Sequence, residues 1–235
     1  MLEPLRTEVL EANLELVRRG LVIYTFGNAS GIHRGEGLIV IKPSGVPYEK
    51  MTAADMVVVD LEGRVVEGRL RPSSDVATHV VLYRAFPAIG GVVHTHSRHA
   101  TAWAQARREI PCFGTTHADY FRGPVPVTDP LEAAEIAGDY EANTGLAIVR
   151  KLGASVAPSG PGMLVAGHGP FAWGHSAGEA AEMAAVLEEL AAMASETLAI
   201  NPGAAPISDT LRDRHFLRKH GPSATYGQGG RQTRE

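Results

Sequence analysis

The sequence places two histidines where they could bind a metal ion. His94 and His96 end an apolar run that begins at Gly90, and such a run is typical of a short buried strand. Side chains two positions apart on a strand point to the same face, so the two imidazoles lie together. Neutral imidazole nitrogen suits zinc and similar divalent ions, which makes the pair half of a candidate metal site. The alternative is that both rings only form hydrogen bonds at a strand end.

A third histidine and a carboxylate could complete this site. His168 stands between two glycines directly after the apolar run 163–166, which we expect to form another buried strand. Three imidazoles that leave one position open would make a bound metal both a Lewis acid and a template for substrate oxygens. Asp75 precedes a predicted helix at 78–86 and could add a carboxylate. Taken alone, His168 could equally be an inert turn residue.

Small and polar residues in turns suggest an anion pocket. Six of them fall in predicted turns or at the start of the helix 78–86, namely Asn28, Lys42, Ser44, Gly45, Ser73 and Ser74. Backbone amides, hydroxyls, a lysine and the helix dipole would together favour a phosphate dianion. The alternative is that the serines only cap the helix and that Lys42 is a solvated surface residue.

Asp119 and Tyr226 are candidate groups for proton transfer. Asp119 belongs to the polar stretch 115–120, which we expect to be a loop. A carboxylate and a phenol can pass protons when a nearby metal or cation adjusts their pKa values. Without further context neither residue stands out, and Tyr226 could belong to an ordinary C-terminal tail.

The elements that must position these groups follow from hydrophobic periodicity and turn signals. Helices are predicted at about residues 2–19, 78–86, 100–107, 130–143 and 176–198. Strands are predicted at about residues 37–41, 56–59, 64–66, 90–94, 110–113 and 163–166. The mixed order of helices and strands indicates an α/β protein whose central sheet is covered by helices on both faces.

Composition excludes several classes of protein. The chain has 235 residues, a formal net charge of -4 and a pI near 6.2, which argue against nucleic-acid binding through a general basic surface. No window approaches 18 uninterrupted apolar residues, and the N-terminus does not resemble a signal peptide, so we expect neither membrane insertion nor export. A single cysteine is consistent with the cytosol, and residues 229–235 read as a mobile tail.

Several sequence blocks, taken together, resemble the class II aldolase/epimerase family, which also includes the adducin head domain. The blocks agree in order and spacing and read GNAS, KPSG, PSSD, GVVHTHS and HGPF. The likeness covers nearly the whole chain. The blocks TTHADYF and HFLRKHG are most similar to the L-ribulose-5-phosphate 4-epimerases within that family.

The resemblance implies a fold and an assembly. Residues 1–228 would form one domain, with residues 229–235 as its flexible tail. The domain would be a three-layer α/β/α structure, in which a central and mainly antiparallel sheet is covered by helices on both faces. Four subunits would form a homotetramer with fourfold symmetry and with active sites at the subunit interfaces.

The resemblance also implies roles for the candidate residues. Zinc, with manganese or cobalt as alternatives, would be held by His94, His96 and His168, with Asp75 on or beside the metal. Asp119 and Tyr226 would be the acid/base pair, one of them reaching over from a neighbouring subunit. The substrate and phosphate positions would be Asn28, Lys42, Ser44, Gly45, Ser73, Ser74, Thr116, His215 and Arg218.

The implied reaction interconverts L-ribulose 5-phosphate and D-xylulose 5-phosphate, a step of arabinose catabolism. The hydrogen on carbon 4 is not acidic, so we expect inversion by metal-assisted retro-aldol cleavage and re-addition. Fuculose-phosphate-type aldolases carry Glu where this chain has Asp75, which favours the epimerase. The alternatives are a sugar-phosphate aldolase or dehydratase of the same fold, and a binding module of the adducin type, which has lost the metal ligands.

Overall fold

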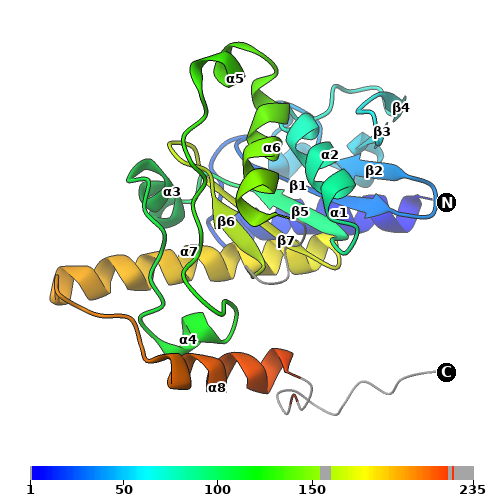
Figure 1. Cartoon of the computed structure of the whole chain (residues 1–235). Helices are drawn as coiled ribbons and strands as arrows, with labels where there is room; N and C mark the ends of the chain where they lie inside the picture. The colour runs from blue at the N-terminus through cyan, green and yellow to red at the C-terminus, as the bar shows by residue number, and fades with distance from the viewer. Residues whose placement is uncertain (1, 154–159, 222–223, 225–235) are drawn as a thin grey trace.

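The computed structural model of the chain describes residues 2–153, 160–221 and 224 (Figure 1). Its α-helices are α1 (Glu3–Arg18), α2 (Val76–Ala85), α3 (Arg98–Gln105), α4 (Thr115–Ala118), α5 (Ala133–Ala137), α6 (Tyr140–Leu152), α7 (Ala177–Ile200) and α8 (Asp209–His220). Its strands are β1 (Asn28–His33), β2 (Leu38–Ile41), β3 (Val57–Asp60), β4 (Val65–Glu67), β5 (Gly91–His94), β6 (Gly162–Leu164) and β7 (Pro170–Gly174). The predicted tail 229–235 and Tyr226 lie outside the described residues.

The strands of the described chain form one sheet in the order β4-β3-β2-β1-β5-β7-β6. Each strand pairs with its neighbours in antiparallel fashion, which confirms the predicted antiparallel sheet. β1 lies in the middle, between β2 and β5. Its register places Asn28 directly opposite His94, so two predicted site residues meet at the same end of the sheet.

One face of the sheet packs against α1 and α7. Its inward side chains include Ala29, Val40 and Val93, which belong to the same buried cluster as residues of both helices. The helices approach closely, because a Cβ at Gly31 would lie 2.8 Å from a methyl carbon of Leu5. This close approach explains why β1 carries a glycine at its centre.

The opposite face packs against α2 and α6, so the sheet lies between two helical layers (Figure 1). Val92 and Trp173 of the sheet share a buried cluster with Tyr83 of α2 and Ile148 of α6. Side chains alternate along a strand, so His94 follows Val92 onto this second face. The predicted α/β/α layering is confirmed, and it sets the direction in which the metal-site residues point.

The predicted helices and strands differ from the structure at several points. The helix expected at 130–143 is wrong, because the chain breaks near Gly138 and α6 starts anew after Asp139, whose carboxylate accepts a hydrogen bond from the backbone of Ala142. The strand expected at 110–113 forms only an isolated bridge between Ile110 and Val125. The loop expected at 115–120 contains the short helix α4.

The sequence prediction also omitted three elements. These are β1, β7 and α8. The polar residues of β1 predict a turn, yet Ser30 is buried and its hydroxyl lies 2.7 Å from His79 Nδ1 and 2.8 Å from the Tyr83 hydroxyl. Partners on α2 thus allow a polar residue in a central strand. No helix among the described residues is long and apolar enough to cross a membrane.

Candidate active site

The end of β5 brings His94 and His96 together. His94 is 2% exposed, its ring stacks on Phe171 with centroids 4.2 Å apart, and its Nδ1 lies 2.9 Å from the carbonyl oxygen of Pro170. Donation from Nδ1 to that carbonyl leaves Nε2 as the nitrogen with a lone pair. The Nε2 atoms of His94 and His96 are 3.0 Å apart. Both rings therefore present nitrogen to the same point.

His168 joins the pair from the turn between β6 and β7. A Cβ at Gly169 would lie 2.7 Å from the backbone oxygen of Thr95, so glycine permits this turn to approach the end of β5. The ligand atoms of His94, His96 and His168 lie within 4.8 Å of one another. Among the described residues, no other group of three or more histidine, cysteine or acidic side chains is placed in this way.

The protonation state of these rings suits a metal ion. Burial lowers the pKa of His94 to about 3, and burial also lowers the pKa of His168. His94 and His168 are therefore neutral near pH 7, which is the form that binds metals. Together with His96, their converging nitrogens fit a divalent metal site.

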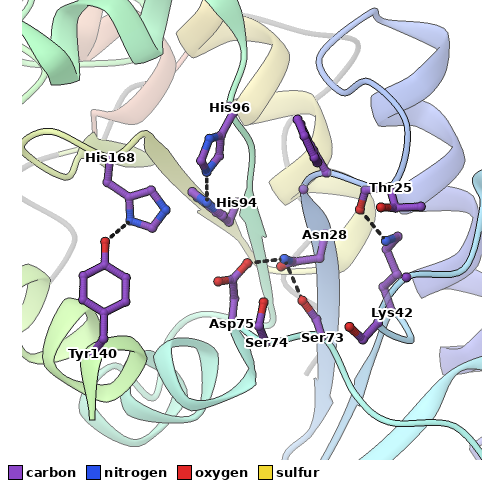
Figure 2. A pocket seen from close by; sticks show the side chains of 14 residues that line it. Thr25, Asn28, Lys42, Ser73, Ser74, Asp75, His94, His96, Tyr140 and His168 are labelled. Atoms are coloured by element: carbon purple, nitrogen blue, oxygen red, sulfur yellow. Dashed lines mark hydrogen bonds between the residues drawn. The ribbon is translucent and has the colours of Figure 1, made fainter. Parts of the chain in front are cut away.

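Tyr140 also lines this site, although no sequence pattern marked it. It is the first residue of α6, and its hydroxyl lies 3.3 Å from Nδ1 of His168 (Figure 2). Histidines that bind metals usually hydrogen-bond through their second nitrogen, which fixes the ring. An isolated tyrosine after a capping aspartate gives no such signal in a sequence, so only the fold reveals it.

Asp75 lies at the N-terminus of α2 but does not cap the helix with its side chain. Its Oδ2 instead accepts a hydrogen bond of 2.6 Å from Nδ2 of Asn28. Burial would raise the pKa of the Asp75 carboxyl, but His94, His79 and the Asn28 amide lower it below its ordinary value. Asp75 is thus a carboxylate that borders the histidine cluster.

The predicted anion residues line the same cavity, which has a volume of about 420 Å³. Figure 2 shows several of them beside the histidine cluster. The six residues are Asn28, Lys42, Ser44, Gly45, Ser73 and Ser74. Asn28 links them to the metal side, because its Nδ2 also donates to the Ser73 hydroxyl at 3.0 Å. Its buried Oδ1 has no protein partner among the described residues, which leaves an acceptor unused.

Lys42 is buried, so its alternative description as a solvated surface residue is wrong. The residue is 2% exposed, and its Nζ donates a hydrogen bond of 2.9 Å to the carbonyl oxygen of Thr25. Burial lowers the pKa of Lys42 to about 8, although the charge of Asp75 acts in the opposite direction. A buried ammonium with a neutral hydrogen-bond partner is a strong attractor for an anion.

The predicted proton-transfer region lies elsewhere in the chain. Asp119 directly follows α4, and α4 packs against α8, away from β5 (Figure 1). Its carboxylate accepts two hydrogen bonds from Arg218 Nη2, at 3.0 and 2.8 Å, and lies 3.1 Å from His215 Nδ1. Burial would raise its pKa, but Arg218, His215 and Lys219 lower it below the ordinary value.

This cluster is separate from the cavity within a single chain. Of the predicted site residues, Thr116, Asp119, His215 and Arg218 do not line the cavity, and Tyr226 lies outside the described residues. The structure therefore brings together the predicted metal and anion residues, but not the predicted acid/base group. The polar residue pattern does not distinguish the two sets, and only the family resemblance implies that one proton-transfer group reaches over from a neighbouring subunit.

Comparison with protein families identifies this arrangement. Residues 7–195 match the family described as the class II aldolase and adducin N-terminal domain. The chain belongs to this family. The match confirms the predicted resemblance.

The alignments with curated relatives cover nearly the whole chain. L-Ribulose-5-phosphate 4-epimerase UlaF of Salmonella paratyphi A is 56% identical over 227 residues, which cover 97% of this chain and 100% of that protein. The UlaF protein of Salmonella typhi matches equally, with 56% identity over 227 residues and the same coverage of 97% and 100%. The chain thus aligns with both curated relatives over their entire length.

Solved structures agree with this family fold. An L-fuculose 1-phosphate aldolase superposes with a TM-score of 0.77 at 25% identity, covering 92% of this chain and 96% of that chain. YgbL of Klebsiella pneumoniae superposes with a TM-score of 0.73 at 28% identity, covering 91% and 99%. Together with the histidine cluster, these matches support the predicted enzyme over a binding module without metal ligands.

Proposed function

We propose that the chain is an L-ribulose-5-phosphate 4-epimerase that interconverts L-ribulose 5-phosphate and D-xylulose 5-phosphate in the cytosol. The observation that carries the proposal is one cavity that joins three converging imidazoles to a buried lysine. A site of this composition suits a substrate that has vicinal oxygens at one end and a phosphate at the other. The name of the full-length relatives at 56% identity supports the same substrate pair.

The chemistry requires a carbon–carbon bond to break. The hydrogen on carbon 4 is not acidic, so a base cannot invert that centre directly. Removal of the proton from the carbon 4 hydroxyl allows the bond between carbons 3 and 4 to cleave, which gives the enediolate of dihydroxyacetone and glycolaldehyde phosphate. Rotation of the aldehyde and re-formation of the bond on its other face give the epimer.

The histidine cluster would stabilise the charge that develops during cleavage. A divalent metal held by His94, His96 and His168, with Asp75 on or beside it, would supply Lewis-acid stabilisation of negative oxygens. We propose zinc, with manganese or cobalt as alternatives, because imidazole and carboxylate ligands accept all three. Asn28 orients the Asp75 carboxylate through its hydrogen bond.

The anion side would keep the aldehyde fragment in place. Lys42, Ser44, Gly45, Ser73 and Ser74 line the cavity together and would bind the phosphate. The Lys42 ammonium supplies charge, and the start of α2 supplies backbone N–H groups. An anchored phosphate lets the aldehyde turn without leaving, which separates an epimerase from an aldolase.

One of the two proton-transfer groups would reach over from a second copy of the chain. Asp119 lies outside the cavity of its own chain, so we propose a homotetramer in which Asp119 and Tyr226 act at subunit interfaces. Thr116, His215 and Arg218 would approach the substrate phosphate from the same side, because His215 and Arg218 contact Asp119 and Thr116 lies on α4. One ring-shaped assembly with a repeated head-to-tail interface would place the two regions together.

The test is incubation of the metal-loaded protein with L-ribulose 5-phosphate while D-xylulose 5-phosphate is measured. We expect the two epimers to reach equilibrium without release of fragments. Free glycolaldehyde phosphate and dihydroxyacetone as the main products would show an aldolase instead. Loss of water from the sugar phosphate would show a dehydratase, and either result would contradict the proposal.

A further inference from the structure

Tyr48 lies behind the cavity and is not part of its lining. It begins the short 3-10 turn η1 (Tyr48–Lys50), which follows the Ser44–Gly45 turn. The residue is 4% exposed and belongs to the cluster that packs against α1 and α7. Burial raises the pKa of its hydroxyl above the ordinary value, so the phenol stays protonated and acts as a hydrogen-bond donor.

The Tyr48 hydroxyl holds the backbone that edges the cavity. Its single proton is shared between the carbonyl oxygen of Phe26 at 2.7 Å and that of Gly27 at 3.0 Å. Phe26 and Gly27 themselves line the cavity. One buried phenol therefore fixes two consecutive peptide groups at the cavity wall.

The same backbone segment packs on the metal side. Gly27 has a φ of +72°, and a Cβ there would lie 2.6 Å from a methyl carbon of Val22 and 3.0 Å from the carbonyl oxygen of His94. The segment 25–27 is thus packed closely against the end of β5. The segment therefore contacts both sides of the cavity, His94 through Gly27 and Lys42 through the carbonyl oxygen of Thr25.

The Tyr48 ring faces the buried ammonium. Nζ of Lys42 lies 4.7 Å from the centroid of this ring, while Lys42 also donates to the carbonyl oxygen of Thr25. A cation over an aromatic face is attracted by the ring, and the attraction is stronger when the cation is desolvated. Ring and backbone therefore both favour the charged form of Lys42 and fix its direction.

We propose that Tyr48 is a positioning residue for the anion side of the cavity: its ring holds the Lys42 ammonium and its hydroxyl holds the segment 25–27. The identity of the anion as a sugar phosphate rests on the proposed function. The contacts that define the role of Tyr48 are made within the protein and do not involve the substrate. The role can therefore be tested with inorganic phosphate as the probe.

Two substitutions separate the hydroxyl from the ring. Tyr48→Phe keeps the ring and removes both hydrogen bonds, so we expect the phosphate dissociation constant to rise about threefold to tenfold. Tyr48→Leu removes both contacts, so we expect a rise of at least about tenfold. Calorimetric titration of the metal-loaded protein with inorganic phosphate measures both values. Tyr24→Phe is the matched control, because Tyr24 is 85% exposed.

The pH dependence of phosphate binding distinguishes this role from simple support of the fold. Asp75 is the charged side chain that acts on Lys42, and it remains in both variants. Tyr48→Leu removes the ring that favours the charged form of Lys42, so the pH at which phosphate binding is lost should fall. Tyr48→Phe keeps the ring, so that pH should stay nearly constant. Under the proposed activity, KM should rise more than kcat falls.

The results divide clearly. Phosphate affinity within twofold of the unmodified protein in Tyr48→Phe, with an unchanged pH midpoint in Tyr48→Leu, would overturn the role of Tyr48 and leave the proposed function intact. No phosphate binding by the unmodified protein would overturn the anion side and the role of Tyr48 together. Melting temperature and metal content establish folding, and Tyr48→Phe alone decides if Tyr48→Leu does not fold.

Discussion

The cavity at the end of β5 and the Asp119 cluster on α4 and α8 hold their polar groups in opposite ways. In the cavity, three imidazoles converge on one point, and the nearby Lys42 ammonium has a backbone carbonyl as its hydrogen-bond partner. In the cluster, the Asp119 carboxylate is already paired with Arg218 and His215. The cavity is built to receive a cation and an anion, whereas the Asp119 carboxylate already has cationic partners within its own chain.

This difference indicates where each part of the chemistry belongs. Binding groups converge within one chain because β1, β5, α2 and the β6–β7 turn meet at one end of the sheet. The acid/base candidate is held on a separate layer, where ion pairs fix its direction. Under the proposed assembly, one chain would supply the metal and anion residues of a site, and a neighbouring chain would supply a proton-transfer group.

Removal of a histidine should produce the largest effect and should act on the cavity alone. His96→Ala deletes one of three converging ligands, so we expect loss of the metal and a fall in kcat/KM of at least about 10³-fold. Metal analysis and the epimerase assay measure both. His33→Ala, at an exposed position of β1, is the control. Stoichiometric metal and full activity in His96→Ala would show that the ligand set is wrong.

Alkaline pH should produce the second-largest effect, because it removes the charge of Lys42 in the cavity. The folded-state pKa of Lys42 is lowered to about 8, so its ammonium is lost as the pH rises through that value instead of near 10.5. We expect kcat/KM to fall about tenfold for each pH unit above this point, because the phosphate loses its cation. Lys42→Arg keeps its charge at this pH, so the alkaline fall in kcat/KM should disappear, although the affinity for the phosphate should also decrease. An alkaline limb at the same pH in Lys42→Arg would contradict the assignment.

Loss of the Tyr140 hydroxyl should have the smallest effect of the three. Tyr140→Phe frees Nδ1 of His168, so we expect metal affinity to fall roughly tenfold, with much of kcat retained at saturating metal. Competition with a chelator measures the affinity, and Tyr24→Phe is again the control. Unchanged metal affinity would mean that the 3.3 Å contact does not orient the ring.

The sequence could predict those parts of the site that depend on local geometry. His94 and His96 share a strand face because of the two-residue period, and Ser73 to Asp75 lie at a helix start because apolar periodicity begins after them. The glycine-flanked turn after the strand at 163–166 made His168 a candidate ligand, and the blocks shared with the class II aldolases then implied that role. These residues line one cavity because the register of β1, β5 and β7 brings the ends of the strands together.

Other features depend on contacts between distant segments and leave no local pattern. β1 is a polar strand, and the hydroxyl of its buried Ser30 has its hydrogen-bond partners, His79 and Tyr83, on α2. The burial of Lys42 depends on Thr25 and on the Tyr48 ring, which no spacing rule connects to it. The separation of Asp119 from the cavity likewise follows from the packing of α4 on α8, which sequence periodicity does not encode.

Hybrid assemblies test most directly whether two chains build one active site. Asp119→Asn keeps the cavity and His96→Ala keeps the acid/base cluster, so each variant alone should be nearly inactive. If equal amounts of the two variant chains assemble at random into tetrameric rings, about one site in four would combine an intact cavity with an intact Asp119 of a neighbour. The account predicts recovery of about a quarter of the unmodified activity after co-expression. Hybrid rings that remain as inactive as the two parents would contradict it.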